Sequence, residues 1–300
     1  MPEAFFTVDG DSYLPGSLTR GPWGAAMGGQ IVGGLLAWGI ERSGIEPDLQ
    51  PARITIDLLR PVLLEPVQIR TSVQREGRRV KLVDGMLIQN GQTVARAGAL
   101  FLRRGDHPEG QVWSTPVQMP PLPTDSAGFP ADMPFFIWGY GATRDGTPGI
   151  ATDEWEQSHS QKFAWARVFR PMVQGHPLTP FTRLAFAGDI TSSLTHWGTS
   201  GLRYINAEYS VTASRLPGGE FVGLAAQSHY GTAGWPPAPL PYSTGTGRSA
   251  PARRWLWPSP PRRSGRRIPR RSGDFRRSHT RICRSGCPLC PPNGNRSARR

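Results

Sequence analysis

One group of side chains in this sequence has the types that bind metals: His279, Cys283, Cys287 and Cys290. Sets of four thiolate and imidazole ligands hold structural zinc. The spacings here, four residues from the histidine to the first cysteine and then four and three, match no common zinc module. The surrounding arginines and prolines also form no strand or helix that could hold the ligands. We therefore predict no metal site and no cofactor.

Two further pairs of residues could act on a bound molecule. Gly28 and Gly29 would allow a ligand to approach the backbone, although close packing of a helix on a sheet explains such glycines more simply. Arg78 and Arg79 could bind phosphate groups, although arginines beside a turn more often face solvent. The sequence has no Gly-x-Ser-x-Gly motif, which argues against an α/β-hydrolase esterase.

The positive charge lies at the C-terminal end. Residues 1–234 carry 19 basic and 21 acidic side chains, whereas residues 235–300 carry 16 arginines and one acid, Asp274. A cationic tail binds nucleic acid through its phosphates, which makes nucleic-acid binding a competing function, but the near-neutral body argues against it. The tail has too few aliphatic residues to form a core, so we predict that it is disordered. Its Arg, Pro, Gly and Ser content is typical of GC-rich DNA read out of frame; a genuine Arg-rich extension is the alternative.

The body of the chain has the composition of a folded protein without a membrane segment. It contains no apolar run of the roughly 18–20 residues that a membrane span needs. It begins with no basic segment followed by an apolar one, so no signal peptide is predicted. All three cysteines lie in the tail. These features lead us to expect a cytoplasmic protein.

The order of predicted elements in the body suggests a repeat. Residues 25–42 are small or apolar on all sides, which is typical of a buried helix. Alternating patterns after it predict antiparallel strands at 53–58, 67–74, 80–89 and 93–103, with a tight hairpin at Asn90-Gly91. A proline-rich linker spans residues 105–132. A second series follows, with strands at 134–144 and 161–171, a helix at 181–197 that starts at Thr179-Pro180, and strands at 203–214 and 220–230. The second series lacks a final hairpin.

These segments resemble double hot-dog acyl-CoA thioesterases. The N-terminal match consists of the Gly-Gly helix, Leu59-Arg60-Pro61, Arg75-Glu76-Gly77-Arg78-Arg79 and Gln89-Asn90-Gly91. The C-terminal match consists of Asp189, Tyr204-Ile205-Asn206-Ala207-Glu208 and the segment from Arg215 to Glu220. The resemblance covers about residues 15–234 and implies an α+β tandem hot-dog, in which antiparallel sheets wrap around central helices. The expected units are a hot-dog at 15–104, the linker at 105–132, a truncated hot-dog at 133–234 and the tail at 235–300.

The resemblance also implies a function in lipid metabolism, the hydrolysis of fatty acyl-CoA to free acid and CoA. The reactive set of the family is an aspartate on the second central helix, matched by Asp189, a Thr or Asn on the next strand, matched by Asn206, and a late-strand glutamine. That glutamine has no match here, which makes a non-catalytic acyl-CoA-binding protein the alternative. Asp189 would activate a water and Asn206 would hold it; a helix-capping carboxylate and a structural asparagine are the simpler readings.

The remaining expectations concern the substrate and the assembly. Gly28, Gly29, Arg78 and Arg79 would bind the substrate, acyl-CoA. Backbone N–H groups at a helix start would stabilise the oxyanion of the reaction. We expect a homo-oligomer that contacts neither a membrane nor nucleic acid.

Overall fold

The computed structural model describes residues 3–106, 109–111, 113, 117–122, 133–140, 161–227 and 229, together with two short strands at 244–245 and 253–258. We call residues 3–106 the N-terminal half, and 133–140 with 161–227 the C-terminal half. In the N-terminal half the elements are β1 (Phe6–Asp9), β2 (Ser12–Pro15), the short 3-10 helix η1 (Ser17–Thr19), α1 (Gly29–Glu41), β3 (Leu49–Leu58), β4 (Gln68–Glu76), β5 (Val80–Gln89) and β6 (Gln92–Arg103).

The C-terminal half likewise has one long helix with strands before and after it. Its elements are β7 (Phe135–Tyr140), β8 (Phe163–Val168), α3 (Pro180–His196), β9 (Trp197–Gly198), β10 (Gly201–Leu202), β11 (Tyr204–Thr212) and β12 (Phe221–Ala225). The two tail strands are β13 (Thr244–Gly245) and β14 (Arg253–Pro258). None of the described helices is both long and apolar enough to cross a lipid bilayer.

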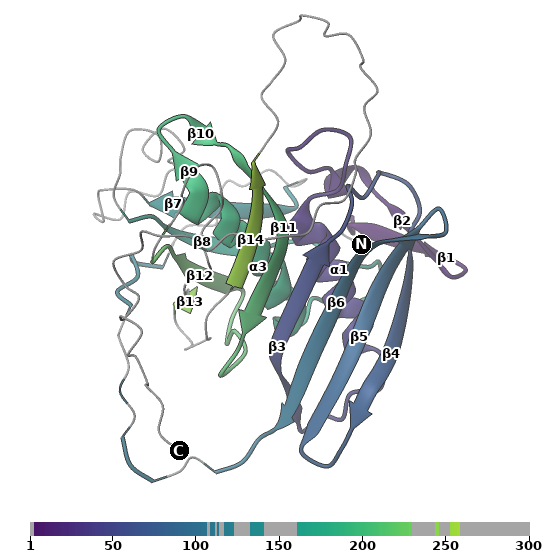
Figure 1. Ribbon diagram of the computed structural model, residues 1–300, viewed down its shortest axis with the longest axis horizontal. Helices are drawn as coiled ribbons and strands as arrows, with labels where there is room; N and C mark the ends of the chain where they lie inside the picture. Colours follow the sequence, from purple (N-terminus) through teal and green to yellow (C-terminus); the bar gives the residue numbers. More distant parts are fainter. Residues whose placement is uncertain are drawn as a thin grey trace, which may run out of the picture. The chain divides into compact units, whose positions relative to one another are not determined.

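Two antiparallel sheets lie against the two long helices (Figure 1). The larger has the order β14-β11-β3-β6-β5-β4, and the smaller has the order β13-β12-β8-β7. Strand β11, from the C-terminal half, pairs with β3, from the N-terminal half, between Thr212–Arg53 and Glu208–Asp57. One sheet therefore runs through both halves, and α1 packs against α3 on its inner side.

The predicted helix and hairpin of the N-terminal half are both present, with one shifted boundary. Helix α1 begins at Gly29, four residues later than Ala25, because Gly28 is extended (φ −67°, ψ 144°) and Ala26 forms a bridge with Leu63. The turn between β5 and β6 places Asn90 and Gly91 at positive φ angles of 50° and 73°. Two such residues are what a type I′ hairpin requires.

Glycines on the two helices allow the close contact between helix and sheet. A Cβ atom at Gly33 would lie 1.6 Å from the hydroxyl of Tyr209, and one at Gly188 would lie 2.6 Å from Val211. Tyr209 is fully buried, and its hydroxyl donates a hydrogen bond of 2.9 Å to the carbonyl of Ala185 on α3. The glycines that lower helix propensity are thus offset by tight packing of α1 and α3 on β11.

Part of the predicted linker is attached to the C-terminal sheet. Val117 and Met119 pack against an aromatic cluster that includes Trp138 and Trp165. The indole N–H of Trp165 donates a hydrogen bond to the carbonyl of Pro120, at 3.2 Å. These contacts cover the otherwise exposed outer aromatic side of β7 and β8.

The tail differs in two places from the prediction of disorder. Segments 244–245 and 253–258 form β13 and β14, which pair with β12 and β11. The open edge of a sheet presents unpaired N–H and C=O groups, which an extended segment can satisfy. Disorder of the rest of residues 235–300 stays a prediction, because that part, including the Cys and His set, lies outside the described residues.

Glu41, at the end of α1, contacts the start of α3. Its carboxylate accepts hydrogen bonds from the hydroxyls of Thr179 (2.5 Å) and Thr182 (3.4 Å), while Thr179 also caps α3 by accepting from the Thr182 N–H. Burial raises the pKa of Glu41, and the two threonine hydroxyls and Arg42 lower it by less. The partly buried carboxyl thus links the two central helices.

This raised pKa predicts how stability depends on pH. The folded state binds the Glu41 proton more tightly than the unfolded state, so its contribution to stability is present below the unfolded pKa and is lost as pH rises through the folded pKa. Glu41→Gln should remove this loss, because an amide oxygen can still accept from both hydroxyls. Urea denaturation from pH 4 to 8 should give a flatter profile for the variant. A parallel profile, offset downward at every pH, would contradict the assignment.

Candidate functional site

Asp189 and Asn206 meet at the inner side of the large sheet. The side-chain amide of Asn206 donates a hydrogen bond to the Oδ1 atom of Asp189. Both side chains are half-buried. A carboxylate can only accept, so this contact fixes the orientation of the amide and directs the Asn206 oxygen away from Asp189.

The start of α1 lies beside the same carboxylate. A Cβ atom at Gly29 would stand 2.8 Å from both carboxylate oxygens of Asp189. No side chain caps α1, whose N-cap residue is Gly28. The first N–H groups of a helix have no intrahelical acceptor, and the dipole places partial positive charge there. The site therefore combines a carboxylate, an amide and an uncapped helix start.

Gly28 is held in place by neighbouring backbone. Its N–H donates to the carbonyl of Thr19, at 3.1 Å, and a Cβ atom at Gly21 would lie 2.7 Å from its Cα atom. A Cβ at Gly28 itself would meet the folded-back side chain of Gln30, at 2.5 Å. The packing role of these glycines agrees with the structure, since Gly28 is buried among close neighbours, and their role in substrate binding stays a prediction.

A β-bulge turns Asn206 toward Asp189. Opposite β14, Asn206 and Glu208 pair with consecutive residues, so Ala207 is the extra residue in β11. Glu208 pairs with Asp57 on the outer face, where burial, and to a lesser degree Asp57, raise the pKa of Glu208. Without the bulge, strand alternation would place Asn206 on that outer face too.

The structure does not bring Arg78 and Arg79 to this site. Both are exposed in the turn between β4 and β5. The neighbouring Lys81 donates to the carbonyl of Gly44, which lies just beyond the C-terminal end of α1. Gly29 lies at the other end of this helix, about 18 Å away for 12 residues at 1.5 Å each. Their binding of CoA phosphates stays a prediction.

A second polar cluster, which the sequence patterns did not single out, continues from the site. His196 is buried two turns after Asp189 on α3, and its Nδ1 atom lies 2.7 Å from Nδ1 of His229. The ring of Tyr204 lies 5.7 Å from that of His196 and 5.9 Å from that of His229. Burial lowers the pKa of His229. Two spacings in the sequence could have identified this cluster. His196 follows Asp189 by seven positions on the helix, and Tyr204 precedes Asn206 by two positions on the strand.

No metal ligand set accompanies these polar groups. Among the residues that the structure describes, no three His, Cys, Asp or Glu side chains are grouped so that they could hold a metal ion.

Comparisons with known proteins place the fold. Residues 19–102 match the family model of the acyl-CoA thioesterase N-terminal domain. A hot-dog protein of unknown function from Alicyclobacillus acidocaldarius superposes with a TM-score of 0.62 at 15% identity, covering 85% of this chain and 96% of that one. The acyl-CoA thioesterase II TesB2 of Mycobacterium marinum gives 0.56 at 18% identity, covering 87% and 96%. No curated protein matches the chain.

These similarities test the predicted fold and the predicted resemblance to a family. At such low identity the solved structures establish the fold alone, which is the α+β hot-dog with antiparallel sheets around central helices. The family match rests on residues 19–102, which include α1 and β3 to β6 up to Leu102. The predicted resemblance is therefore confirmed: the chain is similar to double hot-dog acyl-CoA thioesterases, through an acyl-CoA thioesterase N-terminal domain at residues 19–102.

Proposed function

We propose that the protein hydrolyses the thioester of acyl-CoA to a free acid and CoA, with Asp189 as the group that activates water. The observation that carries this proposal is the contact of Asp189 with both Asn206 and the start of α1. A thioester is already activated, so a positioned water and a base are sufficient and no covalent nucleophile is needed.

Each group has a separate task in this reaction. The Asp189 carboxylate accepts a proton from water as the oxygen attacks the thioester carbon. The oxygen of the Asn206 amide, which faces away from Asp189, accepts the other hydrogen of that water. The uncapped N–H groups at Gly29 and Gln30 are suited to hold the negative oxygen of the tetrahedral intermediate. Collapse of the intermediate breaks the carbon–sulfur bond and expels the CoA thiolate, which takes up the proton that Asp189 accepted, so the carboxylate is restored.

Gln30 offers an amide near the site, which bears on the missing late-strand glutamine. Its side chain folds back over Gly28 at the helix start. A carboxamide there could hold the thioester carbonyl in place. We propose Gln30 as a substrate-positioning residue, together with Gly28 and Gly29.

Substitutions of Asn206 test this arrangement directly. Asn206→Leu removes the donor to Asp189 and the acceptor for water, and we expect about a 10²-fold loss of turnover, the effect of losing one oriented polar group. Asn206→Thr introduces a hydroxyl, which can both donate and accept, and threonine is the other residue that the family resemblance allows here, so activity should largely return. Release of free CoA thiol from acyl-CoA substrates of 2 to 16 carbons measures both. Equal rates for Asn206→Leu and the parent would contradict the assigned role.

A non-catalytic acyl-CoA-binding protein is the second candidate. It is favoured by the short second sheet, in which β12 ends at Ala225 and, within the described part of the chain, pairs beyond β8 only with the two-residue strand β13. Release of thiol and the affinity for acyl-CoA distinguish the binding protein from the thioesterase. A binding protein would take up acyl-CoA without releasing thiol, and Asp189→Asn would leave its affinity unchanged.

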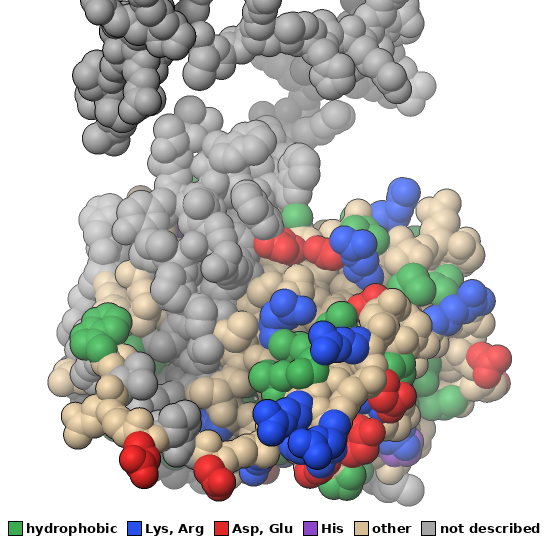
Figure 2. Space-filling view, turned by 60° about the horizontal axis from the view of Figure 1, so that its bottom comes forward, with side chains coloured by type: hydrophobic (Ala, Val, Ile, Leu, Met, Phe, Trp, Pro, Cys, Tyr) green, Lys and Arg blue, Asp and Glu red, His purple; other side chains and the backbone are tan. Residues whose placement is uncertain are grey.

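Nucleic-acid binding has less support from the body of the chain. On the coloured part of the face in Figure 2, which is the part the structure describes, basic and acidic side chains are interspersed. Ion pairs such as Arg96 with Asp57, at 2.5 Å, further reduce the free positive charge of this part. Nucleic-acid recognition normally uses a continuous basic patch.

A further inference from the structure

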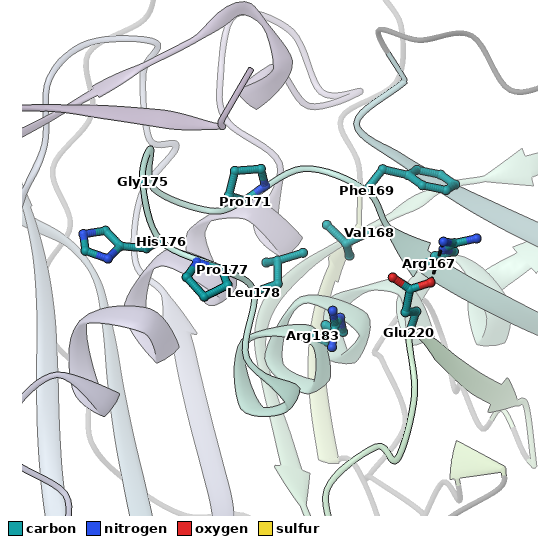
Figure 3. Close-up of a pocket in the computed structure, with 10 residues that line it drawn as sticks. All are labelled: Arg167, Val168, Phe169, Pro171, Gly175, His176, Pro177, Leu178, Arg183 and Glu220. Atoms are coloured by element: carbon teal, nitrogen blue, oxygen red, sulfur yellow. Dashed lines mark ion pairs between the residues drawn. The ribbon is translucent and has the colours of Figure 1, made fainter. Parts of the chain in front are cut away.

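A pocket of about 380 Å³ lies in the C-terminal half, where it is lined by the end of β8, the segment that follows it and the first turns of α3 (Figure 3). Arg183 of α3 lines this pocket, whereas Asp189 of the same helix faces Gly29. Six residues separate the two side chains, which turns them about 120° apart around the helix axis. The pocket is therefore separate from the Asp189 site.

The charges in the pocket are unequal. It contains two arginines, Arg167 and Arg183, and one acid, Glu220. The Nη2 atom of Arg167 and the Oε2 atom of Glu220 form an ion pair of 2.5 Å, which Figure 3 shows at one side of the pocket. The Nε atom of Arg183 is buried and has no hydrogen-bond partner among the described residues. A buried donor on a cationic group is costly unless an acceptor meets it.

Arg167 is held in a fixed position. Its guanidinium lies 5.0 Å from the ring centre of Phe169 and 5.3 Å from that of Phe221. The guanidinium stacks on these rings and uses one side for the ion pair with Glu220. Its other N–H groups remain available to a ligand. A ligand would therefore meet the preformed guanidinium of Arg167 and the guanidinium of Arg183, whose Nε atom has no partner among the described residues.

Apart from these charged groups and His176, the lining of the pocket is mainly apolar. Val168, Pro171, Pro177 and Leu178 supply its walls. A volume of this size and a lining that combines apolar walls with a few polar groups are typical of sites for small organic molecules. The ligand should accordingly have an apolar or aromatic body and an anionic end.

We propose that this pocket binds a small phosphate monoester, whose phosphate contacts Arg183 and the free N–H groups of Arg167. Because Glu220 neutralises one of the two arginines, the net charge of the pocket does not by itself distinguish a carboxylate from a phosphate. The number of acceptors does: a phosphate monoester has three acceptor oxygens and can meet both guanidinium groups, whereas the two oxygens of a carboxylate are used up by one bidentate contact. The organic body would lie against Leu178 and Pro177.

The phosphate could come from a free metabolite or from the nucleotide end of acyl-CoA. The second source rests on the proposed function. Kinetic measurements on Arg183→Gln distinguish the nucleotide end of acyl-CoA from a free metabolite. If the pocket holds the nucleotide end, Arg183→Gln raises the KM for acyl-CoA and adenosine 3′,5′-bisphosphate competes with the substrate. If it holds a free metabolite, the KM is unchanged while phosphate-ester binding is still lost.

Calorimetric titration of the full chain with phenyl phosphate and with benzoate tests the proposal, because the two probes share an aromatic body and differ in charge. We expect phenyl phosphate to bind at least about tenfold more tightly than benzoate, and Arg183→Gln to weaken it at least about tenfold. Glu220→Gln should tighten it, since this change frees Arg167. Arg70→Gln, at an exposed arginine of β4, is the matched control and should have no effect.

Three results would overturn the proposal. These are the absence of phenyl phosphate binding at millimolar concentration, equal affinity in the parent and Arg183→Gln, and weaker binding in Glu220→Gln. Thermal melts of both variants show whether they fold. The gain expected for Glu220→Gln cannot arise from unfolding, so it tests the pocket even if Arg183→Gln proves unstable.

Discussion

Asp189→Asn should lower acyl-CoA turnover by about 10²- to 10⁴-fold, the range that a general base contributes. The asparagine has nearly the same shape but cannot accept a proton from water. The Asn206 amide can still donate to its oxygen, so the contact between α3 and β11 is kept. The KM for acyl-CoA should change little, because the proposed substrate contacts come from the start of α1 and not from this carboxylate.

The comparison requires a variant that makes the same chemical change elsewhere. Asp106→Asn, at an exposed aspartate, serves as this control and should keep full activity. Thiol release gives the rate, and a thermal melt shows that Asp189→Asn remains folded. If the variant hydrolyses acyl-CoA at the parental rate, Asp189 is not the base. If the parent itself releases no thiol while binding acyl-CoA, the non-catalytic function is the correct one.

Gly33→Ala should destabilise the protein by about 3 kcal/mol, at the upper end of the range for overpacked cores. Helix propensity alone predicts the opposite sign, a gain of about 1 kcal/mol for alanine. The added methyl group would lie 1.6 Å from the Tyr209 hydroxyl and 2.9 Å from Ile56. Tyr209 cannot move aside easily, because it is fully buried and bonded to Ala185.

The next residue on the same helix supplies the control. A Cβ at Gly34 would meet the terminal methyl group of Met172, at 2.3 Å, and a flexible methionine end can shift. Gly34→Ala should therefore cost far less in urea denaturation than Gly33→Ala. Tyr209→Phe in the Gly33→Ala background removes the clashing oxygen and should recover part of the loss. No recovery in the double variant would show that the strain lies elsewhere.

Periodic patterns of apolar residues were enough to predict most of the elements. The strand at 80–89 matches β5, and the helix predicted at 181–197 corresponds to α3 at Pro180–His196. Thr179 is the N-cap and Pro180 the first helical residue, as the Thr-Pro pair predicts. These signals are local, so they can be recognised in the sequence without any knowledge of long-range contacts.

The features that the patterns could not predict depend on pairing between distant segments. Strand β11 pairs with β3, which lies about 150 residues earlier in the chain, and its bulge at Ala207 decides which side Asn206 faces. Alternation in the strand gives only two faces and cannot locate an extra residue. The pairing of Asp189 with Asn206 was expected from the family resemblance, while the contact of Asp189 with Gly29 emerged only from the structure.

The pairing of β3 with β11 has a consequence for how this protein can be divided. Gly29 comes from the N-terminal half, and Asp189 and Asn206 come from the C-terminal half. The N-terminal segment is also anchored across the halves, since the N–H groups of Phe5 and Phe6 donate to Pro171 and Met172. Neither half contains all residues of the proposed site. Hydrolysis of acyl-CoA would therefore require that the two halves assemble. Two separately produced fragments would be inert alone and would gain activity only on mixing.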